Sequence, residues 1–209
     1  MGTRHLIAVH VDGEYPIAQY GQWDGYPDGQ GLTVLTFLRE QMRRDELITK
    51  AKSAQEMTQE MRDAELAACG HSGGEWVSLD VSDKYNAQHP QLSRDTGAKI
   101  LAMVQDGEAG MLLSRQLDFA GGSLMCEWAY VVDFDKNTFE VFKGFNKSPL
   151  DPSERFAHLA IDDYVTARGE RYYQVKLAHS WPLDALPDDD AFVAAFKTPE
   201  EDDDEEAAA

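Results

Sequence analysis

The sequence has little of what marks a secreted, membrane-spanning or disulfide-stabilised protein. Its two cysteines, Cys69 and Cys126, stand in different sequence contexts, so no disulfide framework and a reducing compartment, the cytoplasm, are expected. No apolar run approaches the roughly 18 residues that a membrane-spanning helix needs. The N-terminus soon reaches His10 and Asp12, unlike a signal peptide. We therefore expect a cytoplasmic protein that has no membrane partner.

Basic side chains are also scarce, because 19 Lys and Arg stand against 38 Asp and Glu, giving a formal net charge of -19. Direct binding to nucleic acid is not expected, since phosphate contacts need a basic surface. Seven of the acids fall within residues 199–209, which contain no base. We expect this tail to be disordered, because like charges without a buried apolar side chain stay solvated. It is either a solubilising end or a docking segment for a basic protein partner.

The composition is that of one ordinary domain. The chain has 209 residues, of which 43% are apolar and 10% aromatic, enough to bury a sizeable core. We expect residues 1–198 to form a single domain. Helical and strand patterns cluster along the sequence and do not alternate regularly. This favours an α+β fold, with several helices packed on a largely antiparallel sheet, over a doubly wound fold.

Strand patterns are clearest near the N-terminus and in the middle of the chain. Asp12-Gly13 is a two-residue hairpin turn between two apolar stretches, and the first stretch is apolar on both faces, as in a strand buried on two sides. A run of alternating large apolar residues at 124–134 is the strongest strand signal, and 111–119 would precede it in a three-stranded meander. The expected strands cover residues 3–11, 14–22, 75–81, 111–119, 124–134, 138–145 and 171–178.

Four helices are expected. One begins at about Leu32, and a second begins at Ser53, whose hydroxyl and Glu56 have the spacing of a capping box; Gly70 would end it. Two more are expected at residues 95–105 and 191–196.

Three strings match named motifs, but each lacks the context that its chemistry needs. Residues 70–74 fit G-x-S-x-G, yet a helix is expected where the nucleophile elbow needs a strand. The Asp-Thr-Gly triplet at 95–97 lacks a preceding apolar strand and a second copy. Residues 133–138 begin like a calcium loop but have threonine where glycine is required. Because Cys69 and His71 also lack a second ligand pair, no metal and no cofactor are expected.

The strongest candidate site is the loop at residues 19–27, between a strand and a helix N-terminus. Its glycines let a ligand approach the backbone, and the helix N-terminus offers free N–H groups. Gln22, Trp23, Asp24 and Tyr26 combine two aromatic rings with an amide and a carboxylate, a mixture common in binding sites. The alternative is a structural Ω-loop in which Trp23 plugs the core.

A second candidate is Glu127, which lies in the middle of the strongest strand, where its carboxylate would be half-buried. A half-buried carboxylate needs a partner, and Arg4 or Arg94 would serve. The ion pair is either structural or shapes an acid with a raised pKa in a cleft.

Several of these segments together carry a resemblance. Gly2-Thr3-Arg4, the Gln-Tyr-Gly-Gln-Trp-Asp-Gly-Tyr-Pro-Asp-Gly-Gln-Gly string at 19–31, the string at 94–98 and the strand at 126–133 resemble a group of uncharacterised proteins found in phages, bacteria and fungi. The similarity spans most of residues 2–145. The resemblance implies one continuous domain and supplies no reaction.

The first functional hypothesis is a small polar ligand-binding protein whose site is built around the loop at 22–26. If the protein is an enzyme, a hydrolase is expected, with Arg4, Asp24 and Glu127 as catalytic residues and Gln22, Trp23, Tyr26 and Arg94 as ligand-binding residues. A ligand sensor without catalysis would use the same loop.

Two further hypotheses remain. An N-terminal-nucleophile amide hydrolase would use Thr3, but removal of Met1 exposes Gly2, so a further cleavage is required. A non-enzymatic interaction or inhibitor protein, for example in phage–host conflict, would use the acidic surface to attract a basic partner.

Overall fold

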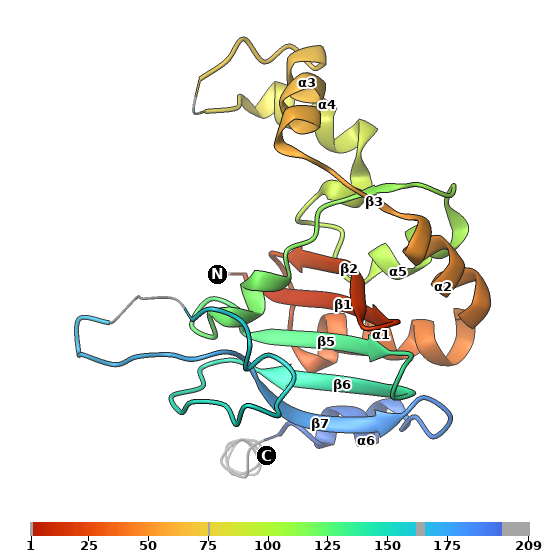
Figure 1. The fold of residues 1–209 in the computed structure, drawn as a ribbon, viewed down its shortest axis with the longest axis vertical. Coiled ribbons are helices and arrows are strands. Elements are labelled where there is room, and N and C mark those ends of the chain that lie inside the picture. The colour runs from red at the N-terminus through yellow and green to blue at the C-terminus, as the bar shows by residue number, and fades with distance from the viewer. Residues whose placement is uncertain (1, 75, 162–165, 198–209) are drawn as a thin grey trace, which may run out of the picture.

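A computed structural model describes residues 2–74, 76–161 and 166–197. These residues form an α+β fold around a five-stranded, mostly antiparallel sheet, which confirms the expected fold class (Figure 1). The strand order is β2-β1-β5-β6-β7; β1 and β5 are parallel, and the other neighbours are antiparallel. The strands are β1 (His5–Val11), β2 (Glu14–Gly21), β5 (Trp128–Asp133), β6 (Thr138–Lys143) and β7 (Lys176–Pro182). The expected acidic tail at 199–209 lies outside the described residues.

The two predicted hairpin pairings are confirmed, but β5 begins at Trp128 and not at residue 124, so Glu127 lies just before the strand and not in its middle. Asp12 and Gly13 both have positive φ angles, 53° and 77°, as a tight turn between antiparallel strands requires. In the second hairpin, β5 pairs with β6, and Asp133 Oδ1 fixes the turn by accepting the N–H groups of Asp135 and Lys136. A register shift between Val9 and Val11 interrupts the first hairpin. Such a bulge re-aims side chains next to it.

The predicted meander is wrong. Residues 111–119 do not pair with β5; instead β4 (Leu112–Leu113) pairs in parallel with β3 (Gln55–Glu56) in a separate two-stranded sheet. The neighbour of β5 on that side is β1. The last strand, β7, begins five residues later than expected, at Lys176 instead of residue 171. Apolar alternation marks a strand, but it does not say which strand lies beside it.

Two predictions around residues 53–81 are also wrong. Ser53 ends helix α2 (Arg44–Ser53), and helix α3 (Gln59–Ala68) is capped by the hydroxyl of Thr58, which accepts the N–H of Met61 at 3.2 Å. The helix ends just before Gly70, as expected. The predicted strand at 75–81 is instead the approach to helix α4 (Leu79–Gln88), whose cap is Ser78. The first error arises because several hydroxyl residues in this polar stretch can cap a helix.

Both faces of the sheet are covered. On one face lie the helical segment at 27–41, which contains α1 (Leu32–Thr36), and the helices α2, α5 (Lys99–Asp106) and α6 (Asp189–Ala194). The other face is covered by residues 117–121 and by parts of the chain between 146 and 175. Val9 and Tyr130 are fully buried on the first face, Ala8 and Val131 on the second. The prediction that the first strand is buried on two sides is therefore confirmed.

Helices α3 and α4 stand apart from this body, beyond the edge strand β2 (Figure 1). Their own core contains Cys69, Val81 and Tyr85, with Leu66 and Leu92 packed against it. Among the described residues, no helix combines the length and the apolar character needed to cross a membrane.

Candidate functional site

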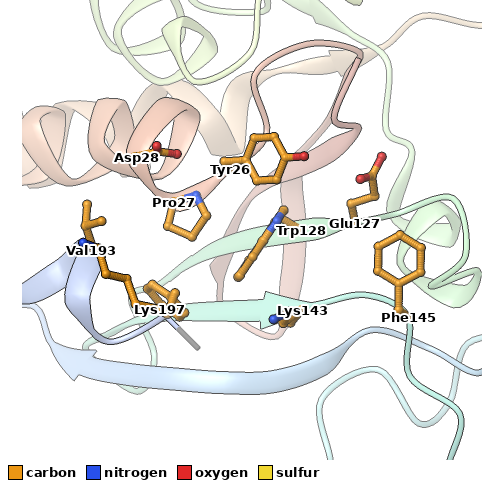
Figure 2. Close-up of a pocket in the computed structure, with 10 residues that line it drawn as sticks. Tyr26, Pro27, Asp28, Glu127, Trp128, Lys143, Phe145, Val193 and Lys197 are labelled. Atoms are coloured by element: carbon orange, nitrogen blue, oxygen red, sulfur yellow. The ribbon is translucent and has the colours of Figure 1, made fainter. Parts of the chain in front are cut away.

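An open cavity of about 680 Å³ lies at the end of the sheet where β1 and β5 begin and β6 ends. We call this end the cavity end. Figure 2 shows Trp128 in the middle of the cavity, with Glu127 and Phe145 on one side and Val193 and Lys197 on the other. The lining residues are Tyr26, Pro27, Asp28, Glu127, Trp128, Lys143, Phe145, Val193, Phe196 and Lys197. Two of them, Tyr26 and Glu127, are candidate site residues from the sequence.

Packing fixes the position of the indole of Trp128. It is the first residue of β5, and its ring meets that of Phe196 edge to face, with centroids 5.5 Å apart. Lys143 stands opposite Trp128 in the β5–β6 register, and its Nζ lies 5.5 Å from the centre of the Trp128 ring. A cation over an aromatic face is an attractive contact. The cavity therefore has a rigid aromatic surface beside a positive charge.

The rim of the cavity exposes apolar surface. Tyr26 and Phe145 line it and are half-exposed, as are Trp23 and Met125 in neighbouring segments. Phe145 also has a left-handed backbone, with φ at 55°, and its N–H donates to Ser123 O at 2.8 Å. A bulky residue rarely adopts this conformation, and such strain concentrates at ligand-binding sites. Exposed large apolar groups gathered at one end are typical of a binding surface.

Glu127 has Arg4 as its partner. Arg4 contacts Glu127 Oε1 twice, through its backbone N–H at 3.2 Å and its Nη2 at 3.5 Å. Arg4 Nη1 also lies 2.8 Å from the sulfur of Met125, whereas the buried Nε has no hydrogen-bond partner. Of the two arginines proposed from the sequence, Arg4 is thus the one beside Glu127, at the rim of the cavity.

The loop around Trp23 is hydrogen-bonded to Arg94 and Asp95. The indole Nε1 of Trp23 donates to Asp95 Oδ1 at 2.8 Å, and the N–H of Gln22 donates to Arg94 O at 2.9 Å. Tyr20 donates its hydroxyl to Gln22 Oε1 at 2.5 Å. Because the indole of Trp23 is half-exposed, the alternative in which it plugs the core is wrong.

Arg4 and Arg94 both act on Tyr20. Burial raises the pKa of the Tyr20 hydroxyl, and the positive charges of Arg4 and Arg94 oppose that rise. The printed polar contact of the Tyr20 hydroxyl is with Gln22, and the two arginines act on it through their charge. Arg94 is itself exposed and is not part of the cavity lining.

Asp24 has a different position. Its φ is 58°, its carbonyl accepts the N–H of Gln30 at 2.8 Å, and its carboxylate lies directly against Gly29, where an added Cβ would come within 2.5 Å of Asp24 Cγ. A carboxylate beside the first turn of a helix is stabilised by the free N–H groups there. Of the candidate residues, Tyr26 and Glu127 line the cavity, and Arg4 is joined to it only through its contacts with Glu127; Asp24 and Arg94 are outside the lining.

Most of the lining was not predicted. Lys143 could have been found, because the predicted turn at 135–138 sets the hairpin register that places it opposite Trp128. Phe196 and Lys197 gave no signal in the sequence, because the end of the chain reaches the cavity only through the packing of α6.

The opposite end of the sheet holds a group of titratable side chains that the sequence analysis missed. His10, Asp133 and Asp135 each place a ligand atom within 4.8 Å of the others. However, Asp133 already accepts two backbone N–H groups and pairs with Arg155, and Asp135 accepts the N–H groups of residues 12 and 13. These carboxylates therefore hold the two turns. A hollow of about 450 Å³ beside them is lined by His10, Gly13, Glu14, Tyr15, Leu117, Lys136, Arg155 and His158.

Nucleophilic side chains are scarce in the described lining of the cavity. Among the described residues that line it there is no serine, threonine or cysteine to serve as a nucleophile. The nearby Cys126 is fully buried, and burial raises the pKa of its thiol far above the ordinary value. Thr3, the nucleophile of the N-terminal hypothesis, is buried, and its carbonyl accepts the N–H of Gly25 at 3.0 Å.

Comparisons of the chain with models of protein families, with curated proteins and with solved structures found no match.

Proposed function

We propose that the protein binds a small polar ligand with a flat apolar part in the cavity at the start of β1 and β5. The observation that carries this proposal is the combination of a fixed indole, two half-exposed rings and charged groups of both signs around one opening. A volume of about 680 Å³ falls in the range of small-molecule sites.

The lining indicates the chemistry of the ligand. Tyr26 and Phe145 are half-exposed and offer aromatic surface against which a planar group can pack, next to Trp128, which is only 6% exposed. Lys143 and Lys197 supply positive charges, and Glu127 and Asp28 supply carboxylates. A molecule with a ring and both hydrogen-bond donors and acceptors would use all three features, whereas a purely apolar molecule would leave the charges unpaired.

Binding without turnover explains the geometry better than hydrolysis does. In an acyl-transfer hydrolase a nucleophile stands beside a base, and the described lining offers carboxylates, amines and the Tyr26 hydroxyl, with no serine, threonine or cysteine beside a base. Hydrolysis with Glu127 activating a water molecule is the enzymatic alternative. One assay distinguishes hydrolysis from binding without turnover, because a hydrolase would consume the captured ligand.

The proposal is tested with a panel of small planar compounds, each carrying an amine, a carboxylate or both. Their binding to the protein is measured by tryptophan fluorescence and calorimetry. We expect at least one compound to bind saturably. Lys143→Met should weaken its binding about tenfold, because the cation is next to the aromatic surface.

Lys136→Met is the matched control. Lys136 is an exposed lysine at the other end of the same hairpin, so its replacement should leave the affinity unchanged. Equal losses in the two variants, or no saturable binding by any compound, would contradict the proposal.

A further inference from the structure

Large apolar side chains are exposed in the connection that leads into α4 and at the first residue of that helix. Trp76 is 88% exposed and Leu79 is 83% exposed, and Val77 between them is also exposed. We call these three residues the Trp76 patch. Water around a large apolar side chain is unfavourable, and tryptophan is among the residues that most often dominate binding at protein interfaces.

A small cavity lies beside helix α3 and the same connection. It has a volume of about 330 Å³ and is lined by Asp63, Ala67, His71, Gly73 and Gly74. Gly73 and Gly74 have positive φ angles of 91° and 110°, and a Cβ at either position would meet nothing within 4 Å, so the backbone there is open to a partner. Asp63 is exposed and places a carboxylate at this cavity.

The charge of the region selects the partner. Residues 58–88 contain six acidic side chains but only two basic ones, Arg62 and Lys84. One of the two bases, Lys84, is already paired with Asp80 at 2.7 Å. A second copy of this chain, with its net charge of -19, would be repelled, as would an anionic lipid surface or a nucleic acid. The surface is complementary to a basic protein segment.

We propose that the α3–α4 pair is a docking surface for a basic protein partner. An apolar side chain of the partner covers the Trp76 patch, and a lysine or arginine of the partner enters the cavity beside Asp63. This interaction is independent of ligand binding at the cavity end, and it does not require the acidic tail at 199–209. It deepens the interaction hypothesis by placing it on a defined part of the fold.

The test uses the full chain and a defined probe. The probe is a labelled synthetic helical peptide with leucine on one face and lysine on the other, and its twin has glutamate in place of lysine. We expect the basic peptide to bind with a change in fluorescence anisotropy, and binding should weaken at high salt. The glutamate twin should not bind.

Variants locate the binding. Trp76→Ala combined with Leu79→Ala should weaken peptide binding about 30-fold, because it removes the apolar anchor. Asp63→Asn should weaken it about fivefold. Leu177→Ala, at a half-exposed leucine on β7, is the matched control and should retain the wild-type affinity, as should deletion of residues 199–209. Because Trp76, Leu79 and Asp63 are exposed, these variants are expected to fold, which thermal unfolding checks.

Four results would overturn the proposal. They are wild-type affinity in the Trp76→Ala/Leu79→Ala variant, equal binding of the glutamate twin, a loss on tail deletion as large as the loss in that variant, and absence of saturable binding by the basic peptide. Sedimentation adds a fifth, because self-association that depends on Trp76 would show that the patch binds a second copy of the chain.

Discussion

The two ends of the central sheet use charge in opposite ways. At the cavity end, Arg4 and Glu127 form a loose pair 3.5 Å apart, with side chains 30% and 15% exposed. At the other end, which we call the ion-pair end, Arg155 is 6% exposed and contacts both Asp133 and Glu140, which are 0% and 7% exposed. The first arrangement leaves hydrogen-bonding capacity beside a cavity, and the second consumes it.

The bulge in the first hairpin helps to build the ion-pair end. Tyr15 packs on the same face as His10, with ring centroids 4.7 Å apart, and its hydroxyl accepts a hydrogen bond from Arg155 Nη1 at 2.9 Å. Arg155 thus has three partners, Tyr15, Asp133 and Glu140. Charges that are buried and mutually paired hold a structure in place, whereas half-exposed rings around an opening are available to a ligand.

The largest change in the free energy of unfolding is expected for a substitution at the ion-pair end. Arg155→Met leaves the buried carboxylates of Asp133 and Glu140 without their counter-charge. Loss of one partner from a buried network costs about 3–5 kcal/mol of unfolding free energy. Urea unfolding measures it, and adding Asp133→Asn and Glu140→Gln to the same chain should recover part of the loss. A change below about 1 kcal/mol would mean that this end is not built on paired charge.

The next effect is a pH dependence at the cavity end. His5 is fully buried there, and burial lowers its pKa from 6.5 to about 4, with only weak opposition from the backbone of Thr3. Because the folded pKa is below the unfolded value, the unfolded state takes up the proton first as the pH falls. The free energy of unfolding should therefore decrease between pH 6.5 and pH 4, by about 3 kcal/mol.

The matched variant for this pH dependence is His5→Asn. It does not titrate, so its stability curve should be flatter than that of the wild type over this range, whatever its absolute stability. Unfolding followed by circular dichroism at several pH values provides the comparison. Parallel curves for the two proteins would show that His5 does not carry the effect.

The smallest effect is expected for the loose pair. Glu127→Gln should change the free energy of unfolding by less than about 1 kcal/mol, since a part-exposed ion pair contributes little to stability. It should nevertheless weaken ligand binding several-fold if the carboxylate contacts the ligand. Calorimetry measures the effect of Glu127→Gln on ligand binding, and unfolding of the same sample measures its effect on stability. A large loss of stability with unchanged ligand binding would place Glu127 in the same structural role as Asp133.

The parts of the fold that could be predicted are those specified by local chemistry. The Asp12-Gly13 turn and the alternation at 124–134 predict their hairpins without reference to the rest of the chain, although the strand itself begins only at Trp128. The pairing of β1 with β5 could not be predicted, because these strands are separated by more than one hundred residues and the same patterns suit other neighbours.

The candidate site divides in the same way. Tyr26 and Glu127 were found because an aromatic in a glycine-rich loop and a carboxylate within an apolar run each conflict with their surroundings, although Glu127 lies just before β5 and not inside it. Arg155 was missed because it lies in an irregular segment without periodicity, and its role appears only when residues 133 and 140 are brought next to it.

The most direct test of the account is a chemical-shift map of the full chain with a saturating planar polar compound from the panel. We expect the shifts to concentrate at Tyr26, Trp128, Lys143 and Phe145, at the cavity end. Shifts concentrated instead at His10, Tyr15 and Lys136, with the first group unmoved, would place the ligand at the ion-pair end and contradict the central claim.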